Sequence, residues 1–199
     1  MHIAYDHNWI RVVDGVISRE FCDHLIEKFE DSQPKLWRRT DYARLWELNL
    51  YSTNYRPYSA MDLIQGRSHG HDFTAECEQL VTAVYSAVGD YREHWDRFHS
   101  FPEDFSMEGF RIKCYRAGSG DHFPIHTDSG SREMSTRFLA FLFYLNDSDA
   151  GTEFPLENHT VDCRQGRLVM FPPGMQWPHI GQAPKNCDKY ILSTYLHFI

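Results

Sequence analysis

The second half of the chain, from about residue 105, is a series of short apolar segments separated by residues that favour turns. The turn residues include Gly118 and Gly120, Gly166, and the Pro172-Pro173-Gly174 run. The segments predicted as strands are 109–115, 123–127, 137–145, 160–163, 167–171, 177–180 and 189–198. Many short strands that pair with one another predict a sandwich or a jelly roll, that is, a double-stranded β-helix. The expected fold class is therefore mainly β.

Two helices are predicted before these strands. Ser18 is a suitable N-cap for a helix that runs to about residue 30 and carries one apolar stripe. Asp72 is a suitable cap for a second helix, in which apolar residues from Phe73 to Trp95 recur every three or four positions. Residues 9–13 and 45–51 are predicted strands, and residues 146–149 a turn. We expect the two helices to cover one sheet.

The length of 199 residues predicts a single domain. Its first part, 1–105, would support a jelly-roll core formed by 106–199. Residues 52–70 have little periodicity, and a connection of that length is either a functional loop or lid or simply disordered.

Composition argues against several classes of partner. The net charge of −8 has the wrong sign for a protein that binds nucleic acid. Five widely spaced cysteines are an odd number without a C-x-x-C motif, which argues against a disulfide framework. No signal peptide is recognisable, and the longest apolar run, residues 138–145, is far too short to span a membrane. We expect a cytoplasmic protein that does not bind membranes.

His126, Asp128 and His179 form an H-x-D pair followed by a distant histidine. On a strand, residues two apart point to the same side, so His126 and Asp128 would project together. Two imidazoles and one carboxylate can bind one face of an octahedral Fe(II) ion and leave three positions open. The chain has 12 histidines, so the pattern could also arise by chance, with ordinary hydrogen-bonded histidines in a fold without a metal. A rival set of ligands is His69, His71 and Asp72.

The order of motifs around this triplet adds to the argument. Tyr115-x-x-Gly118 precedes the H-x-D pair, and segments 137–147, 151–155, 166–172 and 189–196 follow it in order, with His179-x-Gly181 between the last two. Residues 110 to 198 thereby resemble the Fe(II)/2-oxoglutarate-dependent oxygenases, and among them the prolyl 4-hydroxylase-like branch. One departure is a single glycine, Gly151, where many relatives have two.

The resemblance implies Fe(II) bound by His126, Asp128 and His179, with 2-oxoglutarate and O2 as co-substrates and ascorbate as a candidate reductant. Lys189 matches the basic residue that pairs with the far carboxylate of 2-oxoglutarate, with Lys185 as the alternative cation. The further residues of this pocket would be Tyr144, Ser193 and Tyr115, although both tyrosines could instead be core residues. Strand alternation predicts that Lys189, Ile191, Ser193 and Tyr195 share one face.

The resemblance also implies that the enzyme hydroxylates an organic substrate and releases succinate and CO2. Arg137 and Tyr195 match positions that face the substrate in relatives, and Tyr51, Tyr55, Arg56 and Tyr58 would suit a peptide-binding lid. A prolyl residue in a peptide or protein is the first candidate substrate, and a free amino acid or another small molecule is the second.

Two other classes of protein compete with this interpretation. Demethylation of nucleic acids is disfavoured by Lys189, where such relatives typically have arginine, and by the net charge of −8. A non-catalytic, cupin-like metal-binding protein is disfavoured because it has no reason to keep the three ligands and the basic residue together. The sequence does not indicate an oligomeric state.

Overall fold

The structure is a computed structural model, and it describes residues 2–32, 36–39, 44–50, 72–96 and 100–199. The described residues do not include the possible lid at 52–70, the aromatic and basic residues suited to a lid, or two of the rival ligands. These residues are Tyr51, Tyr55, Arg56, Tyr58, His69 and His71.

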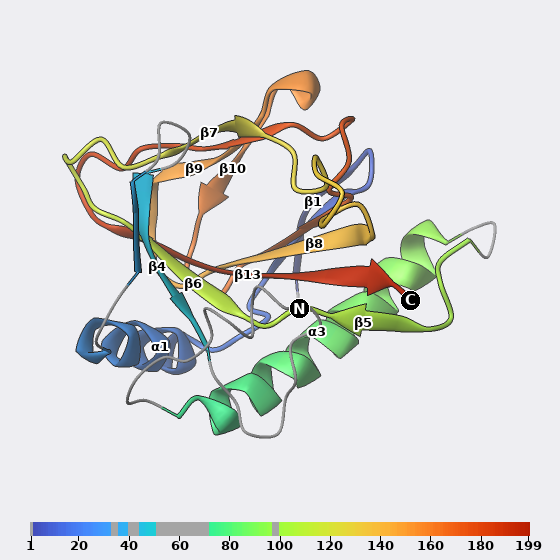
Figure 1. Cartoon of the computed structure of the whole chain (residues 1–199), viewed down its shortest axis with the longest axis horizontal. Helices are drawn as coiled ribbons and strands as arrows, with labels where there is room; N and C mark the ends of the chain where they lie inside the picture. The colour runs from blue at the N-terminus through green and yellow to red at the C-terminus, as the bar shows by residue number, and fades with distance from the viewer. Residues whose placement is uncertain (1, 33–35, 40–43, 51–71, 97–99) are drawn as a thin grey trace.

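Two antiparallel sheets face each other and form the body of the protein (Figure 1). The smaller sheet has the order β10 (His159–Cys163), β9 (Ser148–Phe154), β12 (His179–Gly181) and β7 (Phe123–His126). The larger sheet has the order β1 (His2–His7), β2 (Ile10–Asp14), β11 (Leu168–Phe171), β8 (Arg137–Tyr144), β13 (Lys189–Phe198), β6 (Arg111–Tyr115), β4 (Arg44–Asn49) and β3 (Leu36–Arg39), with β5 (Phe105–Met107) also paired to β13. This architecture confirms the predicted mainly β jelly roll.

Both predicted helices are present, and both lie on the side of the larger sheet away from the smaller one (Figure 1). Helix α1 (Arg19–Asp31) begins after Ser18, whose hydroxyl accepts the Phe21 N–H at 3.1 Å as predicted. Helix α3 (Thr74–Trp95) has Phe73 rather than Asp72 at its N-cap position. The Asp72 carboxylate nevertheless accepts the Thr74 N–H at 2.9 Å, so it still satisfies one free donor of the first turn.

Side chains on the two faces of the larger sheet belong to two separate cores. On β13, Leu192 and Leu196 face the helices and pack with residues such as Phe29 of α1 and Leu80 of α3. Ile191 and Tyr195, the alternate residues, join the second core between the two sheets. Each fully buried side chain of this size stabilises the fold by about 1.5–3 kcal/mol. The inner face of β13 is therefore fixed toward the smaller sheet.

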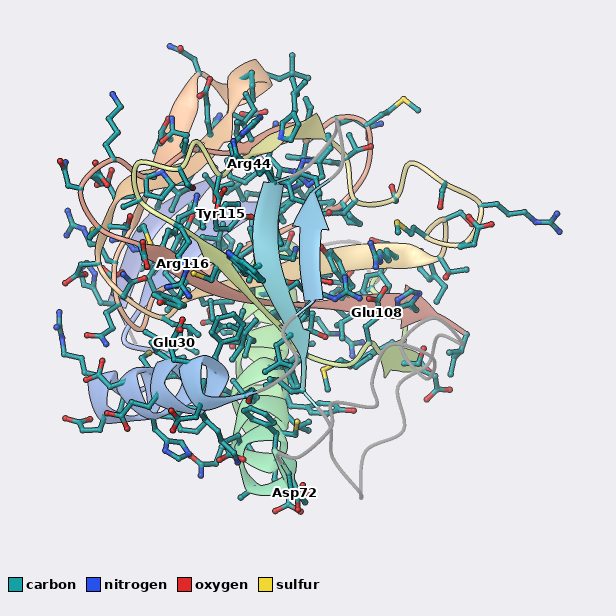
Figure 2. The ribbon with its side chains drawn as sticks, turned by 60° about the vertical axis from the view of Figure 1, so that its left-hand side comes forward. Glu30, Arg44, Asp72, Glu108, Tyr115 and Arg116 are labelled. Atoms are coloured by element: carbon teal, nitrogen blue, oxygen red, sulfur yellow. The ribbon has the colours of Figure 1, made fainter. Side chains whose placement is uncertain are left out.

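An ion-pair cluster also ties α1 to the larger sheet. Arg116, directly after β6, donates to both carboxylate oxygens of Glu30 on α1 at 2.9 and 3.0 Å, and Figure 2 shows the two residues facing each other. The same guanidinium donates to Asp188 at 2.7 Å, just before β13. The cluster thus holds together the helix and the ends of two sheet strands.

The prediction of a turn at 146–149 is wrong for its second half, where β9 begins at Ser148. This strand lacks an alternating apolar pattern, which is why the sequence did not indicate it. At Gly151 a Cβ atom would lie 2.3 Å from the Val161 carbonyl oxygen, so the close approach of β9 and β10 requires glycine there. Strands β1, β3 and β5 were also not predicted. Among the described helices, none has the length and apolar character needed to cross a membrane.

Candidate metal centre and its pocket

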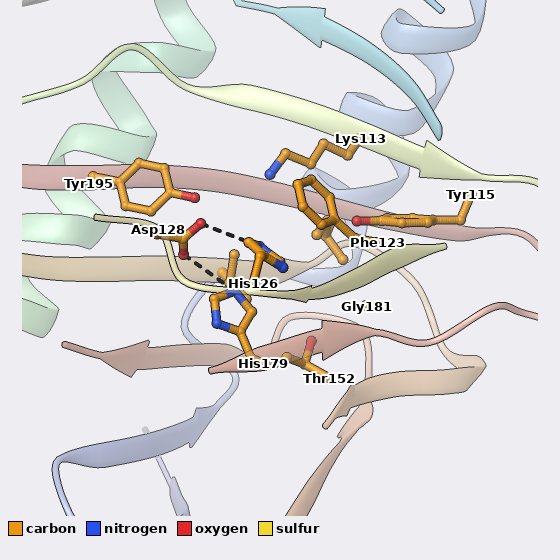
Figure 3. Close-up of a pocket in the computed structure, with 11 residues that line it drawn as sticks. Lys113, Tyr115, Phe123, His126, Asp128, Thr152, His179, Gly181 and Tyr195 are labelled. Carbon is orange, nitrogen blue, oxygen red and sulfur yellow. Dashed lines mark ion pairs between the residues drawn. The ribbon is translucent and has the colours of Figure 1, made fainter. Parts of the chain in front are cut away.

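The two histidines of the triplet are brought together by strand pairing. β7 and β12 are antiparallel neighbours in the smaller sheet, and His126 and His179 are direct partners across them. Cross-strand partners project from the same face, so the two imidazoles meet, with ring centroids 4.2 Å apart. Figure 3 shows both rings turned toward Asp128.

Asp128 reaches the site through a turn, not through the strand alternation that we predicted. β7 ends at His126, and the Asp128 N–H donates to the Pro173 carbonyl at 3.1 Å, outside the sheet ladder. The Asp128 carboxylate then lies between the rings. Its Oδ1 is 3.5 Å from His126 Nε2 and its Oδ2 is 3.4 Å from His179 Nε2.

The hydrogen bonds of the two rings give them an orientation that suits metal binding. Nδ1 of His126 faces the Pro124 carbonyl at 2.8 Å, and Nδ1 of His179 faces the Trp177 carbonyl at 3.2 Å. A carbonyl can only accept, so each Nδ1 carries the proton, and in a neutral ring Nε2 presents a lone pair. Two nitrogen lone pairs and a carboxylate therefore converge, with all ligand atoms within 4.8 Å of one another.

The two imidazole nitrogens and the carboxylate form a group of electron-pair donors that fits a bound cation. Asp128 is buried, and its Oδ2 has no hydrogen-bond partner among the described residues. Burial is costly for an unpaired carboxylate, and a metal ion would remove that cost. Two imidazoles and one carboxylate are also the ligand set typical of non-haem Fe(II). The residues present therefore fit the metal that the sequence predicts.

The protonation states at neutral pH suit metal binding. Burial lowers the pKa of His179 to about 4, so this ring is neutral at pH 7. Burial alone would raise the pKa of Asp128, but the adjacent His179 and His126 outweigh it and hold the pKa below its usual value. Metal ligands must be deprotonated, and both groups meet that condition without help from the ion.

Arg137 braces the turn that carries Asp128. Its NH1 donates to the Asp128 carbonyl at 2.8 Å, and its NH2 donates to the Glu108 carboxylate at 2.8 Å. The guanidinium also lies 3.8 Å from the ring centroid of Tyr195. His197 Nε2 is 2.7 Å from Glu108 on the other side. In this structure Arg137 thus contacts residues that hold Asp128 in place. A contact between Arg137 and the substrate stays a prediction.

A cavity opens beside His126, Asp128 and His179 on the inner face of the larger sheet (Figure 3). Tyr115, a predicted residue of the 2-oxoglutarate pocket, and Tyr195, a predicted substrate contact, line it together with His126, Asp128 and His179. The other lining residues described are Lys113, Phe123, Leu142, Thr152, Gly181 and Ile191.

The remaining predicted pocket residues lie on the same inner face. Lys189 is the cross-strand partner of Tyr115, and its Nζ is 4.4 Å from that ring centroid. The ammonium donates to the carbonyls of Gly151 at 3.2 Å and Gln182 at 2.7 Å. The Tyr144 hydroxyl donates to Thr152 Oγ1 at 2.7 Å. Ser193 is 1% exposed, and its hydroxyl has no hydrogen-bond partner among the described residues.

Lys189 is a buried cation without a counter-ion in the part of the chain that the structure describes. It is 1% exposed, and burial lowers its pKa to about 8. Lys185, the alternative cation, is exposed and lies in the loop before β13. The carboxylate of a bound ligand would compensate the buried charge of Lys189. At Lys185 the same carboxylate would stay exposed to solvent.

Sequence reasoning missed a second buried lysine, Lys113 on β6. Its side chain is 7% exposed and lines the cavity beside the ligands. Burial lowers its pKa, and Glu47, its cross-strand partner on β4, partly opposes that effect. Alternation along β6 places Lys113 on the same face as Tyr115, so the strand pattern could have revealed it.

Fold and site together define a jelly-roll protein with a His-Asp-His site, and comparisons with known proteins agree with this class. The family model described as the 2OG-Fe(II) oxygenase superfamily matches residues 110–197. The resemblance predicted from the motifs is thereby confirmed over these residues. Among curated proteins, no sequence matches that of this chain.

Solved structures with the same fold include prolyl hydroxylases. The viral collagen prolyl hydroxylase of Paramecium Bursaria Chlorella virus-1, solved with 2OG, has a TM-score of 0.66 and 14% identity, over 98% of this chain and 99% of that one. A prolyl hydroxylase from Trichoplax adhaerens, in complex with a hypoxia inducible factor peptide, has a TM-score of 0.69 and 14% identity, over 96% and 84%. A Pseudomonas putida prolyl-4-hydroxylase has a TM-score of 0.66 and 14% identity, over 97% and 94%.

Proposed function

We propose that this protein is an Fe(II)- and 2-oxoglutarate-dependent dioxygenase that hydroxylates an organic substrate. The observation that carries the proposal is the convergence of His126 Nε2, His179 Nε2 and the Asp128 carboxylate beside a cavity inside the jelly roll. When bound there, Fe(II) supplies O2 activation coupled to the oxidation of 2-oxoglutarate to succinate and CO2.

The chain's own residues hold the ion and keep its surroundings fixed. The Pro124 and Trp177 carbonyls hold the two rings in one tautomer and one orientation. Arg137 holds the turn of Asp128 through the backbone carbonyl. Aromatic and aliphatic side chains on the inner faces of both sheets exclude water from the reaction. We assign no side chain as a general base.

We propose that Lys189 binds the far carboxylate of 2-oxoglutarate, with Ser193, Tyr144 and Tyr115 as its neighbours. Two features support this assignment: Lys189 is buried without a counter-ion among the described residues, and the Ser193 hydroxyl has no partner there. An incoming carboxylate would satisfy both. In this structure the Gly151 and Gln182 carbonyls accept hydrogen bonds from the Lys189 ammonium.

The first candidate substrate is a prolyl residue of a peptide or protein. It is supported by the prolyl hydroxylases that share this fold, one of them solved with a peptide. Arg137 and Tyr195 are the candidate contacts to substrate, and Tyr195 lines the cavity beside the ligands. A free amino acid or another small molecule is the second candidate.

The proposal is tested by succinate release from 2-oxoglutarate in the presence of Fe(II), ascorbate, and a panel of prolyl peptides and free amino acids. His126→Ala, Asp128→Ala and His179→Ala should each abolish iron-dependent succinate formation. His122→Ala is the matched control, because this histidine is exposed and lies four residues from His126. Unchanged turnover in the three ligand variants would refute the assignment of the metal site.

A further inference from the structure

Two lysines, not one, are buried toward the interior of the jelly roll. Lys189 and Lys113 lie on adjacent strands, β13 and β6, and flank Tyr115, which is the cross-strand partner of the first and lies two residues from the second. Lys113 directly lines the cavity that contains the three ligands. Burying an ammonium group costs free energy unless an anion or hydrogen-bond acceptors compensate it.

Lys113 lacks such compensation in the part of the chain that the structure describes. No hydrogen bond or ion pair reaches its ammonium there, and its one ring contact is Phe123, with the centroid 5.6 Å away. Glu47 lies across from it on β4, but this carboxylate is also 3.3 Å from the guanidinium of Arg111. Glu47 is therefore shared between the Lys113 ammonium and the Arg111 guanidinium.

The proposed co-substrate cannot supply the missing anion. One carboxylate of 2-oxoglutarate would bind the metal together with its 2-oxo group, and the other would pair with Lys189. Asp128, the remaining carboxylate of the cavity lining, is a candidate metal ligand. Both ends of the co-substrate are thus used, and Lys113 is left for another anionic group.

The position of Lys113 is that of a substrate contact. Figure 3 shows its ammonium and the Tyr195 hydroxyl directed toward the same space beside Asp128, whereas Tyr115 lies on the far side of Phe123. Lys189, whose Nζ lies 4.4 Å from the Tyr115 ring centroid, is not among the residues that line this cavity. Lys113 and Tyr195 together can donate hydrogen bonds to both oxygens of a carboxylate.

We propose that the prime substrate carries a carboxylate that binds Lys113, with the hydroxyl of Tyr195 as its second donor. This inference rests on the proposed function and narrows its substrate class. The carboxylate could be that of a free amino acid, the C-terminus of a peptide, or an acidic side chain next to the oxidised residue. All three present the same chemistry to the ammonium group.

The experiment compares acids with their neutral counterparts by calorimetric binding. The full chain is loaded with Mn(II) and N-oxalylglycine, an unreactive analogue of 2-oxoglutarate, so binding is measured without turnover. The three pairs are L-proline and L-prolinamide, a short peptide ending in proline and its C-terminal amide, and an amide-capped prolyl peptide with glutamate or glutamine beside the proline. The pair that shows a preference for the acid identifies the source of the carboxylate.

We expect the acid of at least one pair to bind about 10- to 100-fold more tightly than its neutral counterpart, the usual effect of a hydrogen bond to a charged group. Lys113→Met should abolish this preference and leave 2-oxoglutarate binding to the Mn(II) protein unchanged. Lys113→Arg should keep the preference. Lys185→Met is the matched control at an exposed lysine, and it should behave as the unaltered protein does.

Three results would overturn the inference. The first is that no acid binds more tightly than its neutral counterpart in the unaltered protein, a comparison that does not depend on any variant folding. The second is a preference that survives Lys113→Met. The third is a loss of 2-oxoglutarate binding in Lys113→Met, which would make Lys113 the co-substrate anchor. Failure of the unaltered protein to bind Mn(II) and 2-oxoglutarate would instead refute the proposed function.

Discussion

The buried pair of Glu108 and Arg137 offers a sharp test of how the site is supported. Glu108 is 3% exposed and accepts from Arg137 NH2 at 2.8 Å, and His197 Nε2 lies 2.7 Å from the same carboxylate. Glu108→Gln would leave the Arg137 guanidinium buried without its anion. Breaking a buried ion pair by removing one partner typically costs about 3–5 kcal/mol.

That cost is large compared with the stability of a whole domain, which is about 5–15 kcal/mol. For a chain of this size, 1 kcal/mol corresponds to roughly 2–4 °C in Tm. Glu108→Gln should therefore lower Tm by roughly 6–20 °C, measured by circular dichroism on the metal-free protein. Mn(II) affinity should fall as well, because Arg137 holds the carbonyl of Asp128.

A double variant separates the ion pair from other effects at Glu108. Glu108→Gln combined with Arg137→Met removes both charges, so its loss of stability should be smaller than the sum of the two single losses by about 0.5–3 kcal/mol. Glu103→Gln, at an exposed glutamate nearby, is the matched control and should leave Tm unchanged. The reasoning would be refuted if Glu108→Gln lowered Tm by less than about 2 °C, or if the two single losses of stability were additive in the double variant.

Two further predictions concern the co-substrate and the metal. Burial lowers the pKa of Lys189 to about 8, and only its ammonium form pairs with a carboxylate, so 2-oxoglutarate affinity should be constant below about pH 8 and fall by about tenfold per pH unit above it. Calorimetry on the Mn(II) protein measures this, and a flat profile up to pH 9.5 would contradict the role of Lys189. Mn(II) at about 100 times its Kd should stabilise the fold by about 2.7 kcal/mol, or roughly 5–11 °C in Tm. The shift should vanish in His126→Ala and persist in His122→Ala; an equal shift in both variants would place the ion elsewhere.

The elements with strong periodicity were predictable from the sequence. In α1, α3 and β13, the apolar positions of the sequence coincide with the face that the structure buries. These elements also fix the inner face on which Tyr195 and Lys189 lie. The order of motifs was enough to indicate the class of protein, because its distant segments meet only in this fold.

Features that depend on tertiary contacts were not predictable. The turn after β7 that carries Asp128 is held by the Pro173 carbonyl, which is distant in the sequence, and by Arg137 on the next strand, and both contacts exist only in the folded chain. β9 has a polar, glycine-containing sequence, and it is a strand because it is held between β10 and β12. The burial of Glu108 likewise arises from packing, since glutamate is usually exposed.

The direct pairing of His126 with His179 across β7 and β12 makes the centre vulnerable to small changes in chain length. Inserting or deleting a single residue between Pro172 and Trp177 would slide β12 by one position along β7, so its side chains would exchange faces. The sheet could keep its backbone hydrogen bonds while the second imidazole turned away from Asp128. A lineage could therefore lose this chemistry in one mutational event and retain a folded jelly roll, which is one route from an oxygenase to a protein of another kind.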